Sequence, residues 1–282
     1  IIGHPKHKSE HIFRAFGQFV DGLGGRYITA EDVNTTVKDM EWVRMETQYV
    51  TGISRALGGS GDPSPVTAFG VFVGIKACLK TKFDQDSVRG VKVAVQGVGH
   101  VGYHICRYLH DAGAELYVTD IDQERLDRCA AEFDAQAVNG EDIHTLDVDV
   151  FAPCAMGAIL NDATIPELKA PIVAGAANNQ LGNSAVHGEM LIKRGILYAP
   201  DYAINAGGLI NVANELEGYN RERAFKQAEG IYDTLMDIFK RSATEGVPTN
   251  VASDRQAEDR IRQVAKLKTF YTRPAGRTFR RG

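Results

Sequence analysis

The chain has 282 residues, of which 44% are hydrophobic and 24% are charged, and this balance is ordinary for a globular protein of one or two domains. Its formal net charge of −4 provides no bulk positive field to attract nucleic acid or an anionic membrane surface. No run of about 18 apolar residues occurs, which argues against a transmembrane helix. We therefore expect neither nucleic acid nor a membrane as a partner.

The first third of the chain predicts three helices, with a glycine- and proline-rich loop before the third. Apolar residues at helical spacing predict a helix over residues 11–22. Residues 26–29 are typical of a short strand, and residues 34–36 could cap the helix that follows. The loop from Leu57 to Pro65 is the best candidate for a hinge. Ser64 and Pro65 then favour a helix start, and this helix should run to about Lys82.

Residues 91–122 carry the most informative pattern. An apolar run at 93–95 leads into Gly97, Gly99 and Gly102, a helical segment follows, and a second apolar run at 116–118 ends in Asp120. In a dinucleotide-binding turn the first glycine permits the tight turn, the second lets the backbone approach a pyrophosphate, and the third lets helix and strand pack closely. The pyrophosphate lies at the helix N-terminus, where unpaired N–H groups favour an anion.

Asp120 lies 23 residues after Gly97, close to the ~20 expected of an acid that binds a ribose 2′-hydroxyl. A close-packed β-α-β turn without a ligand is the alternative. The adjacent Asp122, with no arginine expected beside the two carboxylates, favours NAD over NADP.

Further strands are expected at 148–153, 171–175 and 196–199, and the chain is helical from Asn205 onward. Strands that alternate with helices predict an α/β fold with a doubly wound parallel sheet, here a Rossmann-type NAD domain, beside the remnant of a smaller α/β substrate domain. The expected division is residues 1–55 for the partial substrate domain, 56–247 for the NAD domain, and 248–282 for C-terminal helices that return to the substrate domain. The two domains should flank a cleft.

Several polar or glycine-rich segments follow these strands, where ligands of open parallel sheets bind. Ala155 follows the first of them, and Asn178 and Asn179 follow the second. Pro200, Asp201 and Tyr202 follow the strand at 196–199, and a polar and glycine-rich segment from Asn205 to Gly208 comes next. Turn capping is the alternative for any one asparagine. Gly207 and Gly208 open a helix and suggest a close backbone approach to a ligand, and helix–helix packing is the alternative.

Asp32 is the acid that follows a short predicted strand outside the nucleotide unit, where it could be a helix N-cap or a catalytic acid. Three histidines within residues 4–11 could share a helix face, but no cysteine or acid completes a ligand set, so no metal is expected. The cysteines form no Cys-x-x-Cys pair and lie mostly in apolar segments, which predicts reduced thiols and a cytoplasmic protein. They are Cys78, Cys106, Cys129 and Cys154.

Together these segments strongly resemble the glutamate/leucine/phenylalanine/valine dehydrogenase family, and most closely its leucine dehydrogenases. The resemblance covers essentially the whole chain. The segments that carry it are G-R-Y-I-T-A-E-D-V-N-T-T at 25–36, Y-V-T-G-I-S at 49–54, P-S-P-V-T-A-F-G at 63–70, V-A-V-Q-G-V-G-H-V-G-Y-H at 93–104, F-A-P-C-A-M-G at 151–157, A-N-N-Q-L at 177–181, A-P-D-Y-A-I-N-A-G-G-L-I-N-V-A at 199–213 and G-Y-N-R-E-R-A at 218–224.

The resemblance implies reversible oxidative deamination, in which an L-amino acid, NAD and water give a 2-oxo acid, ammonia and NADH. Asp32 matches the family's general acid/base. The expected cofactor contacts are Thr67, Gly97, Val98, Gly99, His100, Val101, Gly102, Asp120, Ile121, Ala155 and Asn178. The expected substrate contacts are Ala30, Thr51, Asn179, Leu209 and Val212.

The small and branched walls of that pocket favour leucine, valine or isoleucine, and phenylalanine stays open. Apolar pockets separate substrates that differ by one methylene by only ~1–3 kcal/mol, so selectivity should be loose. The family is usually oligomeric, so a homo-oligomer is expected of the full-length protein.

The family's catalytic lysine lies in a G-G-G-K segment just ahead of the position that Ile1 occupies, and Lys6 and Lys8 are poor substitutes. We therefore expect an N-terminally incomplete dehydrogenase that binds NAD but turns over poorly. A non-catalytic NAD-binding protein is the rival reading. A dehydrogenase of another substrate class is a second rival, against which the A-N-N-Q and N-A-G-G segments argue.

Overall fold

The computed structural model describes residues 7–32 and 34–268, and the chain divides into two compact units. Among the described residues, unit 1 holds residues 7–32, 34–63 and Gly208–Lys226, and unit 2 holds Ser64–Gly207 and residues 227–268. The first segment of unit 2 therefore lies between two segments of unit 1 in the sequence, and its second segment follows them. No helix in the described residues is long and apolar enough to cross a membrane.

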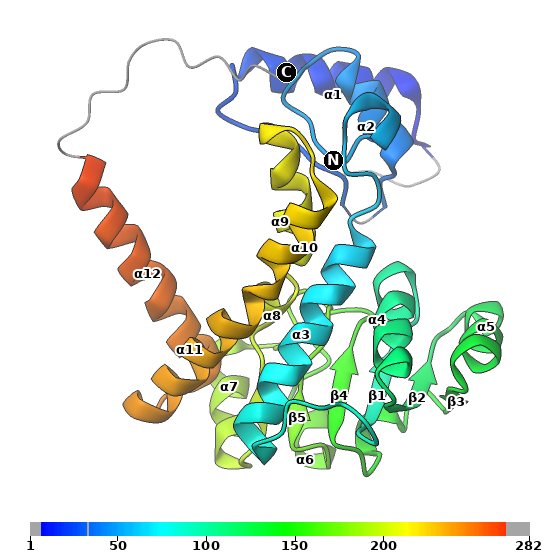
Figure 1. Ribbon diagram of the computed structural model, residues 1–282, viewed down its shortest axis with the longest axis vertical. Coiled ribbons are helices and arrows are strands. Elements are labelled where there is room, and N and C mark those ends of the chain that lie inside the picture. Colours follow the sequence, from blue (N-terminus) through cyan, green and yellow to red (C-terminus); the bar gives the residue numbers. More distant parts are fainter. Residues whose placement is uncertain (1–6, 33, 269–282) are drawn as a thin grey trace. The chain divides into compact units, whose positions relative to one another are not determined.

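Unit 2 is built on a six-stranded parallel sheet with the strand order β3-β2-β1-β4-β5-β6 (Figure 1). This is the doubly wound order, in which β1 lies centrally and the direction of strand succession across the sheet reverses between β1 and β4. The predicted α/β class is confirmed. The strands are β1 (Lys92–Gln96), β2 (Glu115–Thr119), β3 (Gln136–Ala137), β4 (Val150–Pro153), β5 (Ile172–Val173) and β6 (Leu197–Tyr198).

Helices connect these strands and pack on the sheet. Helix α3 packs against α4 and α11, while α4 contacts β1 and β2 (Figure 1). The helices of unit 2 are α3 (Ser64–Phe83), α4 (His100–Asp111), α5 (Gln123–Phe133), α6 (Thr164–Glu167), α7 (Ser184–Lys193), α8 (Asp201–Ile204), α11 (Ile231–Glu245) and α12 (Thr249–Lys268), with the 3-10 helix η3 (Ile143–Thr145). Helices α9 (Gly207–Ala213) and α10 (Arg221–Glu229) continue across the boundaries of the units.

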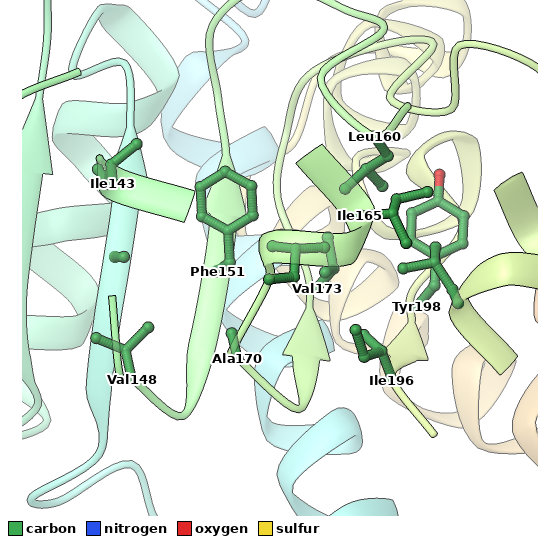
Figure 2. Packing of buried hydrophobic residues seen from close by; sticks show 12 residues of the cluster. Ile143, Val148, Phe151, Leu160, Ile165, Ala170, Val173, Ile196 and Tyr198 are labelled. Carbon is green, nitrogen blue, oxygen red and sulfur yellow. The ribbon is translucent and has the colours of Figure 1, made fainter. Parts of the chain in front are cut away.

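On one face of the sheet, buried residues of four neighbouring strands lie in register. Ala94 of β1 pairs with Phe151 of β4, Phe151 with Val173 of β5, and Val173 with Tyr198 of β6. Because these residues share one face, they form a single buried cluster with Ile143 and with residues of α6 and α7. Figure 2 shows Phe151 within that cluster. A rigid core therefore lies directly below the loops at the carboxyl ends of the strands.

Unit 1 has a smaller core between α1 (Glu10–Gly22) and α2 (Val37–Arg44), with the 3-10 helices η2 (Arg55–Leu57) and η4 (Asn214–Glu217) in its loops. Phe13 of α1 packs with Met40 and Val43 of α2 and with two residues of the next loop. Thr36 caps α2 in a reciprocal capping box with Asp39, as residues 34–36 predicted.

The structure corrects three expectations. Residues 26–29 contribute a single bridge, Thr29 to Val50, and not a strand, because no neighbour continues the pairing. The short strand β3 was not predicted, since its two residues are exposed and show no apolar pattern. Helix α12 packs on α11, α7 and β6 and lies in unit 2, whereas residues 269–282 of the expected C-terminal segment lie outside the described residues.

The unit boundary lies between Pro63 and Ser64, inside the predicted hinge loop but after the expected boundary at residue 55. Residues 208–226 belong to unit 1, although the sequence placed them in the nucleotide domain. A buried carboxylate on that segment, described below, accepts hydrogen bonds from two backbone N–H groups of unit 1. All four cysteines are in the described part of the chain and are free thiols.

Candidate functional site

The turn between β1 and α4 has the geometry that its three glycines predict. Gly97 has a φ of +93°, and a Cβ there would lie 2.8 Å from the Ala155 Cβ. A Cβ on Gly102 would lie 2.0 Å from the carbonyl oxygen of Gly97, so only glycine allows α4 to begin this close to the strand. A Cβ on Gly99 would meet only the Arg125 Nη1, at 3.5 Å. The Gly99 backbone is therefore open to a ligand from outside.

The first turn of α4 lies directly behind Gly99, which is its N-cap without a side-chain hydrogen bond. His100 is exposed and Val101 is partly buried, while Val98 is buried in the turn. Helix N-terminal N–H groups lack intrahelical partners and attract anions. An open glycine before such an end is the site that a pyrophosphate requires.

Asp120 connects the end of β2 to this turn. Its Oδ2 accepts a hydrogen bond from the Val98 N–H at 2.8 Å, and its Oδ1 accepts one from the Asp122 N–H at 3.0 Å. Each carboxylate oxygen can accept a second hydrogen bond, so Asp120 keeps acceptor capacity for a ribose hydroxyl. Ile121, the next residue, is fully exposed and offers an apolar surface beside that carboxylate.

The structure corrects the expectation that no arginine lies beside the two acids. Asp122 caps α5, and one turn into the helix the Arg125 Nε forms an ion pair with the Asp122 Oδ2 at 3.2 Å. The Arg125 guanidinium also lies beside Gly99. Spacing alone did not show this because residues three apart in sequence become neighbours only once the helix forms.

The loops after β4 and β5 are joined to each other. Ala155 is exposed, and a Cβ on Gly157 would lie 2.6 Å from the Asn178 carbonyl oxygen. The Ala158 N–H donates to the Asn179 carbonyl oxygen at 2.7 Å. Asn178 and Asn179 are both exposed on this paired loop, so both side chains can reach a ligand at the carboxyl edge of the sheet.

Asn205 fixes the side chain of Asn178. Its Nδ2 donates to the Asn178 Oδ1 at 2.6 Å and to the Ala176 carbonyl oxygen at 3.1 Å. The amide nitrogen of Asn178 is thereby directed away from Asn205. Sequence reasoning placed Asn205 in a polar segment without giving it a role.

Thr67 lies in the first turn of α3, and Gly207 packs against it. A Cβ on Gly207 would be 2.3 Å from the Val66 carbonyl oxygen and 3.0 Å from the Thr67 Cα. The close approach at Gly207 is therefore to another helix within unit 2, as the packing alternative predicted. This contact fixes the backbone of Thr67.

In unit 1, Asp32 is exposed at the start of a tight turn. Its backbone N–H donates to the Thr35 Oγ1 at 2.8 Å, and its carbonyl oxygen accepts from the Thr35 N–H at 2.8 Å. Thr36, and not Asp32, caps α2, so the N-cap alternative for Asp32 is wrong. The two hydrogen bonds to Thr35 fix the backbone of Asp32.

The other predicted substrate residues of unit 1 differ in burial. Thr51 is buried and its hydroxyl donates to the Thr29 carbonyl oxygen at 3.3 Å, next to the half-buried Ala30. On α9, Val212 is buried, whereas Leu209 is 73% exposed. Lys8, the poor substitute for a catalytic lysine, forms an ion pair with Asp39 at 3.2 Å, and Lys6 lies outside the described residues.

Two glutamates that the sequence did not indicate, Glu215 and Glu31, contact the loop at Gly52 in unit 1. Glu215 is 2% exposed, and its Oε1 accepts from the Gly52 N–H at 2.9 Å and from the Ser60 N–H at 2.8 Å. A Cβ on Gly52 would be 2.9 Å from the Glu31 Cβ, so Glu31 packs on the same loop. Burial, with repulsion from Asp62 and Asp32, raises the pKa of Glu31 to about 7, against the opposing charge of Lys8.

We expect Glu31→Gln to stabilise the protein at alkaline pH. A glutamate in the unfolded chain ionises near pH 4.3, and here the folded pKa is about 7. The folded state therefore binds the proton more tightly, and the stability contributed below the unfolded pKa is lost as the pH rises through 7. Melting temperatures by circular dichroism should show the variant above the wild type at pH 8, with the gap closing towards pH 4.5. The exposed Glu217→Gln is the control, and an equal gap at both pH values would contradict the prediction.

The strand order, the glycine turn before α4, and the acid at the end of β2 define unit 2 as a Rossmann-type dinucleotide-binding unit. The sequence pattern of the Glutamate/Leucine/Phenylalanine/Valine dehydrogenase family matches residues 58–124 and 115–271. A leucine dehydrogenase of Thermoactinomyces intermedius is 56% identical over 272 residues, which are 96% of this chain and 74% of the relative. The chain belongs to this family, and it is an amino-acid dehydrogenase.

Other relatives act on other side chains. An L-tryptophan dehydrogenase of Nostoc punctiforme is 51% identical over 269 residues, covering 95% of this chain and 75% of the relative. The crystal structure of the L-tryptophan dehydrogenase from Nostoc punctiforme superposes with a TM-score of 0.82 at 49% identity, over 94% of this chain and 76% of that one. A hetero-hexameric glutamate dehydrogenase of Thermus thermophilus has a TM-score of 0.76 at 20% identity, over 95% of this chain and 72% of that one, and shares the fold.

Proposed function

We propose that this protein catalyses the reversible, NAD-dependent oxidative deamination of branched-chain L-amino acids, with L-leucine as the preferred substrate. The main support for NAD as the cofactor is the position of Asp120, whose carboxylate is fixed beside the open backbone of Gly99. The 56% identity to a leucine dehydrogenase supports the substrate.

The residues of unit 2 fit a dinucleotide. The helix end after Gly99 would hold the pyrophosphate, Asp120 the adenosine ribose, and Ile121 the face of the adenine. Asn178, directed by Asn205, would donate to the nicotinamide carboxamide at the other end. When bound, NAD accepts a hydride from the substrate α-carbon, and this is the chemistry that the protein does not supply itself.

The residues of unit 1 would act on the substrate. Asp32 would accept a proton from the substrate amine or the attacking water, and return one in the reverse direction. Ala30, Thr51, Leu209 and Val212 would contact the amino acid, and Asn179 of unit 2 would bind its polar end. In balance, amino acid, NAD⁺ and water give 2-oxo acid, ammonium, NADH and a proton.

Arg125 bears directly on the choice between NAD and NADP. Asp120 and Asp122 would repel a 2′-phosphate, but the Arg125 guanidinium beside them is half-exposed and could bind one. We propose that Asp120 makes the site select NAD, and that Arg125 would bind the phosphate once this carboxylate is removed, as arginine forks do.

We expect Asp120→Ser to weaken NADH binding and to tighten NADPH binding by about tenfold, equivalent to ~1.4 kcal/mol. Adding Arg125→Ala should reverse most of the gain for NADPH. Fluorescence titration of both reduced cofactors measures this. Arg128→Ala is the matched control, because Arg128 of the same helix pairs with Glu132 at 2.9 Å. A gain that survives Arg125→Ala would contradict the role of the arginine.

The function itself is tested by formation of NADH at 340 nm from L-leucine, L-valine, L-phenylalanine and L-tryptophan. The assay compares the 282-residue chain with an extended chain, in which the family's G-G-G-K segment precedes these residues. Turnover only by the extended chain, highest with leucine, supports the proposal and the need for that lysine. Equal turnover would show that the lysine is dispensable. NADH binding without turnover in either would favour the non-catalytic reading.

An aromatic substrate is the second candidate, because an L-tryptophan dehydrogenase is 51% identical to this chain. Highest turnover with tryptophan or phenylalanine would establish it. We also propose a homo-oligomer, for which light scattering of the extended chain is the measurement.

A further inference from the structure

Two residues that are not glycine adopt left-handed backbone conformations where the loops after β4 and β5 meet. Ala158 has a φ of +60° and Asn179 a φ of +53°. Such a conformation costs about 1–2 kcal/mol for a residue with a Cβ, and asparagine adopts it more readily than alanine. Interactions around the loop must therefore hold both residues in place.

Asn179 is held through its backbone from both sides. Its N–H donates to the Asp201 Oδ2 at 2.6 Å, and its carbonyl oxygen accepts from the Ala158 N–H at 2.7 Å. Gly157 leaves room for this pairing, since a Cβ there would lie 2.8 Å from the Asn179 carbonyl oxygen. The backbone of Asn179 thus has one fixed partner in each direction.

The side chain of Asp201 is itself fixed by Tyr198 of β6. It is 9% exposed, and its Oδ1 accepts from the hydroxyl of Tyr198 at 2.9 Å. Tyr198 is 2% exposed and belongs to the core cluster under the sheet. Asp201 therefore links the rigid core at β6 to the loop that follows β5.

The place of this loop in the sheet determines which part of a dinucleotide it would contact. The glycine turn follows β1, and Asp120 follows β2 on one side of it. The loop of Asn178 and Asn179 follows β5, on the other side of β1. Since the two mononucleotide halves of this fold bind the two halves of the cofactor, this loop belongs to the nicotinamide half.

We propose that Asp201 is a positioning residue for the nicotinamide end of the site. It acts through the backbone of Asn179 and holds the side chains of Asn178 and Asn179 in the orientation that binding requires. This inference rests on the proposed function, because it assumes that unit 2 binds NAD. A carboxylate suits the role, since one oxygen accepts from the loop and the other from Tyr198.

The test compares the binding of NADH and of ADP-ribose, which has the same adenosine, pyrophosphate and second ribose but no nicotinamide. Both ligands are titrated against the 282-residue chain, NADH by fluorescence and ADP-ribose by calorimetry. Asp201→Ala should weaken NADH binding about tenfold or more, the loss expected of one displaced charged hydrogen bond. Binding of ADP-ribose should stay within twofold of the wild type.

The conservative variant Asp201→Asn keeps an oxygen for the Asn179 N–H and can donate its amide nitrogen to the Tyr198 oxygen. It should restore NADH binding to within about threefold of the wild type. Asp254→Ala is the matched control, because Asp254 likewise accepts a tyrosine hydroxyl, that of Tyr202, at 2.6 Å. It should bind both ligands as the wild type does.

Equal weakening of NADH and ADP-ribose would overturn the proposal, because it would show a general loss of structure, and so would unchanged NADH binding in Asp201→Ala. If Asp201→Ala fails to fold, Tyr198→Phe replaces it. This variant removes only the hydroxyl that fixes Asp201, and it should weaken NADH selectively by about threefold. A wild type that binds neither ligand would refute the proposed function, which separates that failure from a failure of the role of Asp201.

Discussion

Replacing Gly102 with alanine is expected to destabilise unit 2 by about 3 kcal/mol or more and to abolish NADH binding. The added methyl group would lie 2.0 Å from the carbonyl oxygen of Gly97, and a backbone atom cannot move aside as a flexible side chain can. Helix α4 would have to shift away from β1, which separates its N-terminus from the glycine turn. Thermal melting by circular dichroism and NADH titration measure the two losses.

Gly99→Ala is the matched control within the same turn. Its methyl group would meet only the Arg125 Nη1 at 3.5 Å, an ordinary contact with a mobile side chain. We expect this variant to melt within a few degrees of the wild type but to bind NADH about tenfold more weakly, because the methyl group occupies the approach of the pyrophosphate. Equal melting of both variants would show that the third glycine is not needed for helix packing.

The second large effect is expected at Asp32. Asp32→Asn should lower kcat of the extended chain by ~10²–10⁴-fold, the usual contribution of one acid–base group. Asparagine has nearly the same shape and cannot accept a proton from the substrate. Binding of NADH should not change, because the contacts proposed for the cofactor lie in unit 2.

Initial rates with L-leucine and NAD provide the measurement. Asp62→Asn is the control, since it removes another exposed carboxylate that acts on Glu31. Its kcat should stay within threefold of the wild type. If the kcat of Asp32→Asn also stays within threefold of the wild type, another group must transfer the proton. Glu31, whose pKa is about 7, would then be the next residue to test.

Local patterns predicted the nucleotide unit well, because its features follow from sterics within a short stretch of chain. The close approach of α4 to β1 is set by the contact between Gly97 and Gly102. Asp122 caps α5 by accepting hydrogen bonds from the N–H groups of Glu124 and Arg125. The strands β1, β2 and β4 are buried apolar runs. Such elements need little information from the rest of the molecule.

The missed features depend on residues that are distant in sequence or that become neighbours only after folding. Glu215 is separated from Ser60 by 155 residues, and nothing near either one predicts the contact. Asp201 reaches Asn179 across 22 residues, from the turn after one strand to the turn after another. Arg125 approaches Gly99 only because α5 brings its first turn there.

Because residues 64–207 separate two segments of unit 1 in the sequence, they limit the order in which the chain can fold during synthesis. Glu215 cannot bind Gly52 and Ser60 until the ribosome has made all of residues 64–207. Closing a free loop of this length costs roughly 4 kcal/mol in chain entropy. Gly207 packs closely on the backbone of Val66 inside unit 2, so folding of residues 64–207 places the second segment of unit 1 beside the end of the first. Unit 1 therefore cannot be completed before these residues are made, although its first segment precedes them in the chain.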